Sequence, residues 1–203
     1  MPKDGGIGAS SKRREDIRFL TGAGNYTDDI NIRGQAHVFF LRSDIAHGSI
    51  NSVDTSAAEG MPGVVRIFTG ADFEAVGGMP CGWQVTDRHG EAMLEPKHPV
   101  LAHGKVRHVG EPIAAVVADT LEQARDAAEA ITVDISELPA VVDMKDAVAD
   151  SSNKVHDDLP TNLCYDWGFV EENKAATDDA FANAAHVTTL ELVNNRLVAN
   201  PME

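Results

Sequence analysis

The sequence is poor in cysteine, in aromatic residues and in positive charge, and each shortage excludes a class of protein. Its 203 residues hold two cysteines, Cys81 and Cys164, which are far apart and form no Cys-x-x-Cys pair. A disulfide scaffold or a zinc ribbon is therefore not expected. Lys and Arg number 17 against 32 Asp and Glu, which gives a net charge of −15. We expect no nucleic-acid surface, because such surfaces need clustered basic side chains.

Long apolar runs are also missing. No stretch approaches the ~20 apolar residues of a membrane-spanning helix, and the first 16 residues are polar, without the apolar core of a secretory signal. The basic run at 12–14 is followed at once by Glu15 and Asp16, which favours a solvated leader. These features predict a cytoplasmic protein without a membrane span.

The familiar motifs of catalysis and metal binding are absent from the sequence. His-Glu-x-x-His and Gly-x-Ser-x-Gly do not occur. His98, His103 and His108 recur every five residues, a spacing that shares no face of a helix or a strand. A metal site from these three histidines is therefore not expected. "GGIGAS" near the N-terminus follows no strand and opens no apolar helix, so it does not predict a phosphate loop.

Four further candidates have simpler interpretations. Ser43, Asp44 and His47 lie close in sequence, but a catalytic triad is defined by geometry, and no nucleophile elbow surrounds Ser43. The adjacent acids at 28–29 favour a solvated turn, and Cys81 lies in a loop without an adjacent base. Glu111, between a glycine and a proline, is the most interesting acid. We expect it to be a hydrogen-bonded acid at a strand start or a subunit contact, with a catalytic or gating role as the alternative.

What the sequence does contain is a well-specified strand–helix–strand unit over residues 107–143. "IAAVVA" is a continuous apolar run, as expected of a strand covered on both faces. Thr120 and Gln123 form a capping box, and apolar residues then recur at helical spacing. "ITVDISEL" alternates apolar and polar residues, which predicts a half-buried strand.

The flanking segments predict shorter elements. Strands are expected near 36–43, 50–53 and 64–68, with a short helix at 55–60 and a long loop over 74–104. Beyond residue 148 we predict a polar linker, a short helix capped by Thr177 and running to Ala185, and a strand over 186–195. The segment after 148 is expected to be partly mobile. The predicted class is α+β, a mixed sheet around the strand–helix–strand core with few short helices.

Four blocks in order resemble the large subunit of the molybdenum hydroxylases, the xanthine dehydrogenase and aldehyde oxidase family. They are "RREDIRFLTGAGNYTDDI", "LRSDIAHGSI" with "DTSAAEGMPGVVRIFTGADF", "GKVRHVGEPIAAVVADTLEQARDAAEAITVDISELPAVVD" and "NRLVANPME". The resemblance is strongest to the aerobic carbon monoxide dehydrogenase type. Asp44 and Gly48 depart from the family, which usually has Pro and a small residue such as Ala there.

The resemblance implies an α/β hammerhead domain. It implies a flexible leader at 1–16, the hammerhead at 17–148, and a linker with the truncated start of the molybdopterin-binding region at 149–203. The longer protein would hydroxylate or oxidise carbon monoxide, an aldehyde or an N-heterocycle with oxygen from water. It would carry molybdopterin cytosine dinucleotide, and iron–sulfur and FAD subunits would complete a heterotrimer, dimerised in turn.

No catalytic, cofactor-binding or metal-binding residue is carried over to this chain, because the resemblance places those motifs in later regions. The 107–143 unit is then scaffolding, and the 203 residues alone are expected to be inactive. A stand-alone interaction or assembly module without catalytic activity remains the alternative. A hydrolase that uses an unrecognised Ser/His set is the third interpretation.

Overall fold

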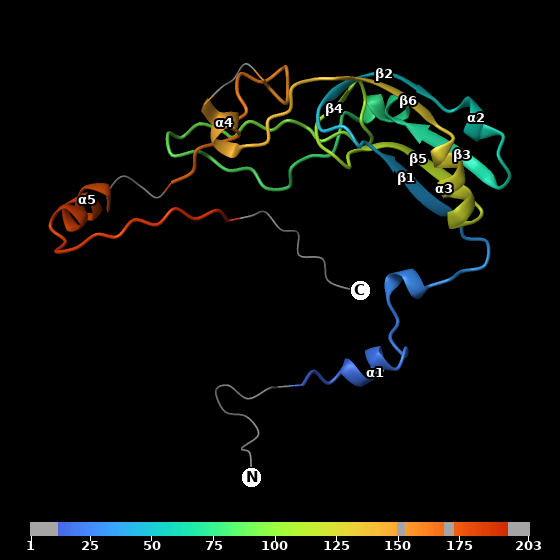
Figure 1. Ribbon diagram of the computed structural model, residues 1–203, viewed down its shortest axis with the longest axis horizontal. Helices are drawn as coiled ribbons and strands as arrows, with labels where there is room; N and C mark the ends of the chain where they lie inside the picture. The colour runs from blue at the N-terminus through green and yellow to red at the C-terminus, as the bar shows by residue number, and fades with distance from the viewer. Residues whose placement is uncertain (1–11, 150–152, 169–172, 195–203) are drawn as a thin grey trace, which may run out of the picture. The chain divides into compact units, whose positions relative to one another are not determined.

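The computed structural model describes residues 12–149, 153–168 and 173–194 (Figure 1). By contacts, the chain divides into two units: residues 36–188 form the larger, and 1–35 with 189–203 the smaller. In the smaller unit, helix α1 (Asp16–Leu20) is followed by the 3-10 turn η1 (Thr27–Asp29). The rings of Phe19 and Tyr26 stack between them with centroids 5.5 Å apart.

The larger unit is built on two three-stranded antiparallel sheets. In the first sheet, β5 (Pro112–Ala118) lies between β1 (His37–Arg42) and β3 (Val64–Thr69). In the second, β2 (Gly48–Asp54) lies between β4 (Lys105–Val106) and β6 (Thr132–Glu137). The predicted α+β class with small sheets and few short helices is confirmed. The mixed sheet is corrected, because the described strands pair antiparallel and divide between two sheets.

Helix α3 (Leu121–Glu129) covers one face of the first sheet and contacts β1 and β5 (Figure 1). The predicted capping box is present: Thr120 Oγ1 accepts from Gln123 N at 3.2 Å, and Gln123 Oε1 accepts from Thr120 N at 3.1 Å. Three alanines, Ala124, Ala127 and Ala128, are buried against the sheet. These small side chains let the helix approach closely, and the apolar run of β5 fills the space beneath.

A second core lies under the second sheet. Val106 and Ile113 are buried there, and Val53 and Val133 contact both cores. The predicted alternation of the last strand is confirmed, since Val133 and Ile135 are turned inward. The strand–helix–strand unit therefore joins the two sheets, because β5 belongs to one and β6 to the other.

The remaining elements are short. Helix α2 (Ser56–Glu59) lies within the range predicted at 55–60. Thr55 occupies its N-cap position without a side-chain capping bond, and Gly60 occupies its C-cap position. The 3-10 helix η2 (Gly70–Val76) follows β3. The long loop predicted over 74–104 is present over 77–104, with two isolated bridges, whereas 74–76 belong to η2. Helix α4 (Met144–Ala149) begins soon after β6.

Two expectations near the C-terminus are wrong. Helix α5 (Lys174–Ala182) begins three residues before Thr177, whose hydroxyl bonds to the Asn173 carbonyl from inside the helix. The helix ends at Ala182 because Asn183 caps it, so it does not reach Ala185. The predicted strand at 186–195 is not formed over 186–194, which is exposed and has no strand pairing, and residue 195 lies outside the described residues.

Candidate functional site

The site begins at the turn that leads into the central strand β5. The turn closes with a bond from Glu111 N–H to the His108 carbonyl, and Gly110 in its third position has a φ of 86°. That left-handed conformation costs glycine little and other residues much more. Pro112 then opens β5 at the first position of the strand, where a missing N–H is tolerated. The Gly-Glu-Pro sequence thus specifies a sharp entry into a buried strand.

Glu111 is 1% exposed, and its carboxylate folds back over the turn. Its Oε2 accepts from Arg107 N at 2.5 Å and lies 3.8 Å from His108 Nδ1. Its main chain pairs with the end of β1, because Ser43 N donates to the Glu111 carbonyl at 2.9 Å and Gly110 N donates to the Ser43 carbonyl at 2.7 Å. These contacts are those of a hydrogen-bonded acid at a strand start.

Ser43 and His47 are held by different partners. The Ser43 hydroxyl donates to the Ile45 carbonyl at 2.8 Å and accepts from Ile45 N at 3.0 Å, which makes a local turn. The ring of His47 points elsewhere, with Nδ1 2.7 Å from the Pro139 carbonyl. Asp44 is exposed. The hydroxyl therefore has no activating imidazole, and the three residues do not form a hydrolytic triad.

The three histidines at spacing five are only partly brought together. The rings of His98 and His108 lie 5.9 Å apart, while His98 Nδ1 is 2.9 Å from the Pro99 carbonyl and His103 is exposed. Across the described residues, no group of three or more His, Cys, Asp or Glu side chains is placed to hold a metal ion. Of the adjacent acids at 28–29, Asp29 caps η1: its Oδ2 accepts a hydrogen bond from Tyr26 N at 2.9 Å.

Both cysteines are free thiols in this fold. Cys81 is exposed, and its Sγ lies 3.0 Å from the Trp83 carbonyl. Cys164 donates to the Leu94 carbonyl at 2.7 Å, and burial, with a smaller contribution from Cys81, raises its pKa. A raised pKa keeps the Cys164 thiol protonated, which is unfavourable for a nucleophile.

The segment 153–168 is tied to the rest of the larger unit by polar contacts. Lys105 Nζ on β4 reaches Asp157 Oδ2 at 2.6 Å, and this hydrogen bond lowers the pKa of Asp157. Arg88 reaches Asp166 at 2.9 Å, through both its side chain and its main chain. Burial, followed by repulsion from Arg107, lowers the pKa of His156. A polar segment without a periodic pattern is thus held at Asp157 and at Asp166.

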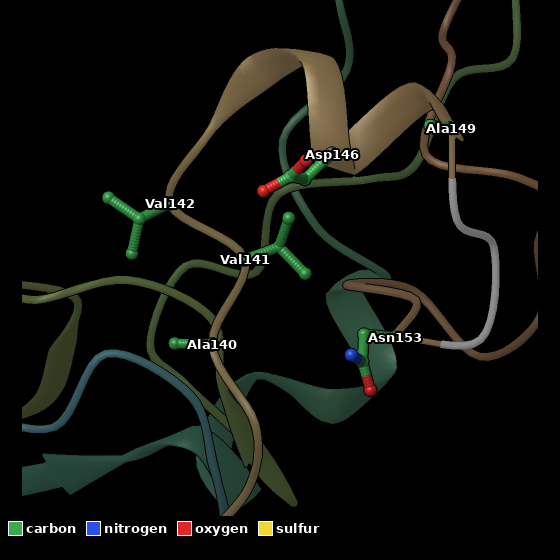
Figure 2. A pocket seen from close by; sticks show the side chains of 6 residues that line it. All are labelled: Ala140, Val141, Val142, Asp146, Ala149 and Asn153. Carbon is green, nitrogen blue, oxygen red and sulfur yellow. The ribbon is translucent and has the colours of Figure 1, made fainter.

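Residues 140–142 line two cavities. The α4 cavity has a volume of about 310 Å³ and is bounded by α4 and Asn153. Figure 2 shows Val141 on the chain that leads into α4 and Asp146 on the helix itself. The histidine cavity has a volume of about 200 Å³ and is lined by Ala46, His47, Arg107, His108, Val109, Ala140, Val141, Val142, Asn153 and Val155.

Two residues that line the histidine cavity each have a buried polar atom that the sequence does not reveal. His47 Nε2 and Arg107 Nε are both buried without a hydrogen-bond partner. Buried polar atoms without partners are rare, so each needs an explanation. Four segments far apart in sequence build this cavity, and no local motif connects them. In particular, no sequence motif singled out Arg107 as a candidate functional residue.

None of the helices in the described ranges is long and apolar enough to cross a membrane.

Comparison with known proteins identifies the class of domain that these features define. Residues 21–139 match the family model described as aldehyde oxidase and xanthine dehydrogenase, a/b hammerhead domain. The chain therefore belongs to the aldehyde oxidase and xanthine dehydrogenase family. The resemblance read from the four sequence blocks is confirmed.

Relatives within the family act on different substrates. The chain is 37% identical over 198 residues to the nicotine 6-hydroxylase large subunit of Paenarthrobacter nicotinovorans, covering 97% of this chain and 23% of that protein. It is 34% identical to the carbon monoxide dehydrogenase large chain of Hydrogenophaga pseudoflava, covering 94% of this chain and 24% of that protein.

A solved structure supports the same assignment. The crystal structure of the Cu,Mo-CO dehydrogenase matches with a TM-score of 0.63 and 32% identity, over 88% of this chain and 23% of that chain. This chain spans about a quarter of the length of the relatives that it matches. Its relatives include molybdenum enzymes and subunits of larger complexes.

Proposed function

We propose that this chain is the N-terminal, non-catalytic scaffold of a molybdenum-dependent oxidoreductase large subunit. The observation that carries the proposal is the match of residues 21–139 to the hammerhead model, within a similarity that extends over 97% of the chain. Because the relatives are about four times longer, most of their residues have no counterpart here. The complete enzyme would hydroxylate or oxidise a small substrate with oxygen from water.

The proposed cofactor is molybdopterin cytosine dinucleotide, held outside these residues. The described residues offer no three-donor cluster for a metal ion, and the acid buried at the start of β5 is already engaged by Arg107 N. In this proposal, no residue of the chain has a catalytic, cofactor-binding or metal-binding role. Its proposed contribution is the pair of sheets that the β5–α3–β6 unit joins.

The proposed domain limits are a leader at 1–16, the hammerhead at 17–148, and a linker with the start of the cofactor-binding region at 149–203. The proposed partners are an iron–sulfur subunit and an FAD subunit in a dimerised heterotrimer in the cytoplasm. A relative named as subunit gamma of a dehydrogenase complex supports a multi-subunit assembly. The relatives' names include a nicotine hydroxylase and a carbon monoxide dehydrogenase, so the substrate class is carbon monoxide, an aldehyde or an N-heterocycle.

Affinity purification of the protein from the cells that encode it tests this proposal. A tag placed at the N-terminus should recover two further subunits, with the visible absorption of flavin and of iron–sulfur clusters. A matched sample from cells that carry the untagged gene controls for carry-over. Recovery of this chain alone, without either chromophore, would contradict the assembly and favour a stand-alone interaction module.

A further inference from the structure

The central strand of the first sheet has apolar side chains on both of its faces. In β5, Ala114, Val116 and Ala118 lie on one face and pack in the core with α3. Ala115 and Val117 alternate with them and therefore lie on the opposite face. When one face of an antiparallel sheet is solvated, that face usually has polar side chains. The sequence of β5 is instead that of a strand covered on both faces.

Strand pairing extends this second apolar face onto both neighbouring strands. Residues directly opposite each other in antiparallel strands lie on the same face of the sheet. Phe40 of β1 and Phe68 of β3 both pair with Ala115, and Val38 of β1 pairs with Val117. These five residues are called the open face below. Its central Ala115 is buried and its Val117 half-buried, but Phe40 is 42% exposed and Val38 is 47% exposed.

The described elements leave the β1 side of the open face uncovered. Helix α3 makes the main helix contacts of β1 and β5, and it packs on the other face. On the open face, η2 reaches only the far strand β3, where the Phe73 ring lies 5.9 Å from the Phe68 ring. Exposed apolar side chains such as Phe40 and Val38 are stabilised when they leave water. The open face therefore has the character of a docking surface.

Two arginines lie at the margins of the open face. The guanidinium of Arg42 is 5.6 Å from the centroid of the Phe40 ring. Arg66 pairs with Val117, and its guanidinium is 4.9 Å from the centroid of the Phe68 ring. In the part of the chain that the structure describes, neither arginine forms an ion pair with a carboxylate. An occupant with apolar side chains and a marginal Asp or Glu would match this surface in charge.

The area of the open face distinguishes between the possible occupants. Three strands ~4.8 Å apart, over about five residues at ~3.3 Å each, present about 240 Å². A stable interface between separate proteins buries ~800 Å² on each partner. A second copy would also bring Arg42 and Arg66 against the same two arginines, and like charges repel. A segment of the same polypeptide can dock on a smaller area, because its covalent link raises its effective concentration.

We propose that the open face is the docking surface for a segment of the same polypeptide that lies outside these 203 residues. The segment packs apolar side chains on Phe40 and Val38 and places a carboxylate beside Arg42 or Arg66. The inference rests on the proposed function, because it needs a longer polypeptide, and the relatives are about four times longer than this chain.

Zero-length cross-linking of the natural polypeptide identifies the occupant. Arg66→Lys keeps the positive charge and adds a primary amine, which a carbodiimide couples to a carboxylate in contact with it. Mass spectrometry should find residue 66 joined to an Asp or Glu of the same polypeptide outside the 203 residues. Arg42→Lys tests the other margin of the open face independently, and one of the two variants should give the link.

Arg125→Lys is the matched control. Arg125 is also exposed and lies over an aromatic ring, 5.5 Å from the centroid of Phe39, but it belongs to α3 on the covered side of the sheet. Its lysine should not couple to the carboxylate that residue 66 or residue 42 reaches. The same link from all three variants would show that the coupling is not specific to the open face and would overturn the proposal.

The other occupants give different cross-links. When ¹⁵N-labelled and unlabelled polypeptides are mixed before coupling, a link that joins the two isotopes identifies a second copy. A link to another subunit identifies a separate partner. Either result, a link only to carboxylates within the 203 residues, or no link from residue 42 or 66 would overturn the proposal.

The same sample separates this inference from the proposed function. If the natural polypeptide is about four times longer and holds molybdenum, but its links are not those expected, only the docking surface is wrong. A natural polypeptide of this length without molybdenum would contradict both.

Discussion

Glu111 provides the sharpest test of the reasoning about this fold. Its carboxylate is buried and accepts from Arg107 N at 2.5 Å. Replacing Glu111 with Ala leaves that N–H without its partner, at a cost of ~1–3 kcal/mol. Loss of the buried methylene adds ~0.8 kcal/mol. The free energy of unfolding should fall by about 2–4 kcal/mol, which lowers Tm by roughly 4–16 °C for a chain of this length.

Glu111→Gln separates the hydrogen bond from the charge. Glutamine keeps an acceptor oxygen near Arg107 N but loses the charge that makes the bond about twice as strong. The expected cost is ~1 kcal/mol, well below that of the alanine variant. Glu129→Ala, on the exposed side of α3, is the control and should stay within ~0.5 kcal/mol of the parent.

Urea unfolding followed by far-ultraviolet circular dichroism measures these differences, and amide hydrogen exchange at Arg107 reports the bond directly. The alanine variant should exchange the Arg107 amide much faster than the control does. If Glu111→Ala is as stable as Glu129→Ala and the Arg107 amide keeps its protection, the carboxylate does not hold the turn and the reasoning fails.

Three further predictions concern other parts of the structure. Gly70→Ala would place a Cβ 2.3 Å from the Ala102 carbonyl oxygen and should lower the free energy of unfolding by ~1–3 kcal/mol. At Gly60, an added Cβ meets nothing within 4 Å, so Gly60→Ala should raise the free energy of unfolding by ~0.4–1 kcal/mol. Equal shifts in Tm for the two variants would refute the packing argument. Because folding lowers the pKa of His156, its contribution to stability is complete above about pH 6.5 and is lost as the pH falls toward the pKa of His156 in the folded state. Between pH 7.5 and 5.5, Tm should therefore fall less in His156→Gln than in the parent. Identical changes of Tm with pH in the two proteins would contradict this. In amide hydrogen exchange, residues 153–168 should exchange more slowly than residues 185–194, which lack strand pairing. Faster exchange in 153–168 would show that the polar contacts of this segment do not persist.

Local signals explain which parts of the fold could be predicted. Helix α3 is specified by its capping box and its buried alanines, all within ten residues, so the sequence defines it without help from distant contacts. Strand alternation also predicts β6 correctly. It fails at 186–194 because alternation shows that a strand is possible but does not supply a partner to pair with.

Long-range arrangement explains what could not be predicted. The division of β5 and β6 between two sheets depends on pairings with β1, β2 and β3, which no local pattern records. The same holds for the histidine cavity, where His47 and Arg107 are 60 residues apart in sequence. Glu111 stood out because glycine and proline flank it, and its partner at Arg107 lies only four residues away.

The most direct test of the central claim is the molybdenum content of two samples. One is the natural polypeptide that carries this sequence, purified from its cells, and the other is the 203-residue chain produced alone in a host that makes the pterin cofactor. If this chain is scaffold, the natural polypeptide should be about four times longer and hold about one molybdenum with a pterin nucleotide, while the 203-residue chain holds neither. Stoichiometric molybdenum in the 203-residue chain, or a natural polypeptide of this length without molybdenum, would contradict the account.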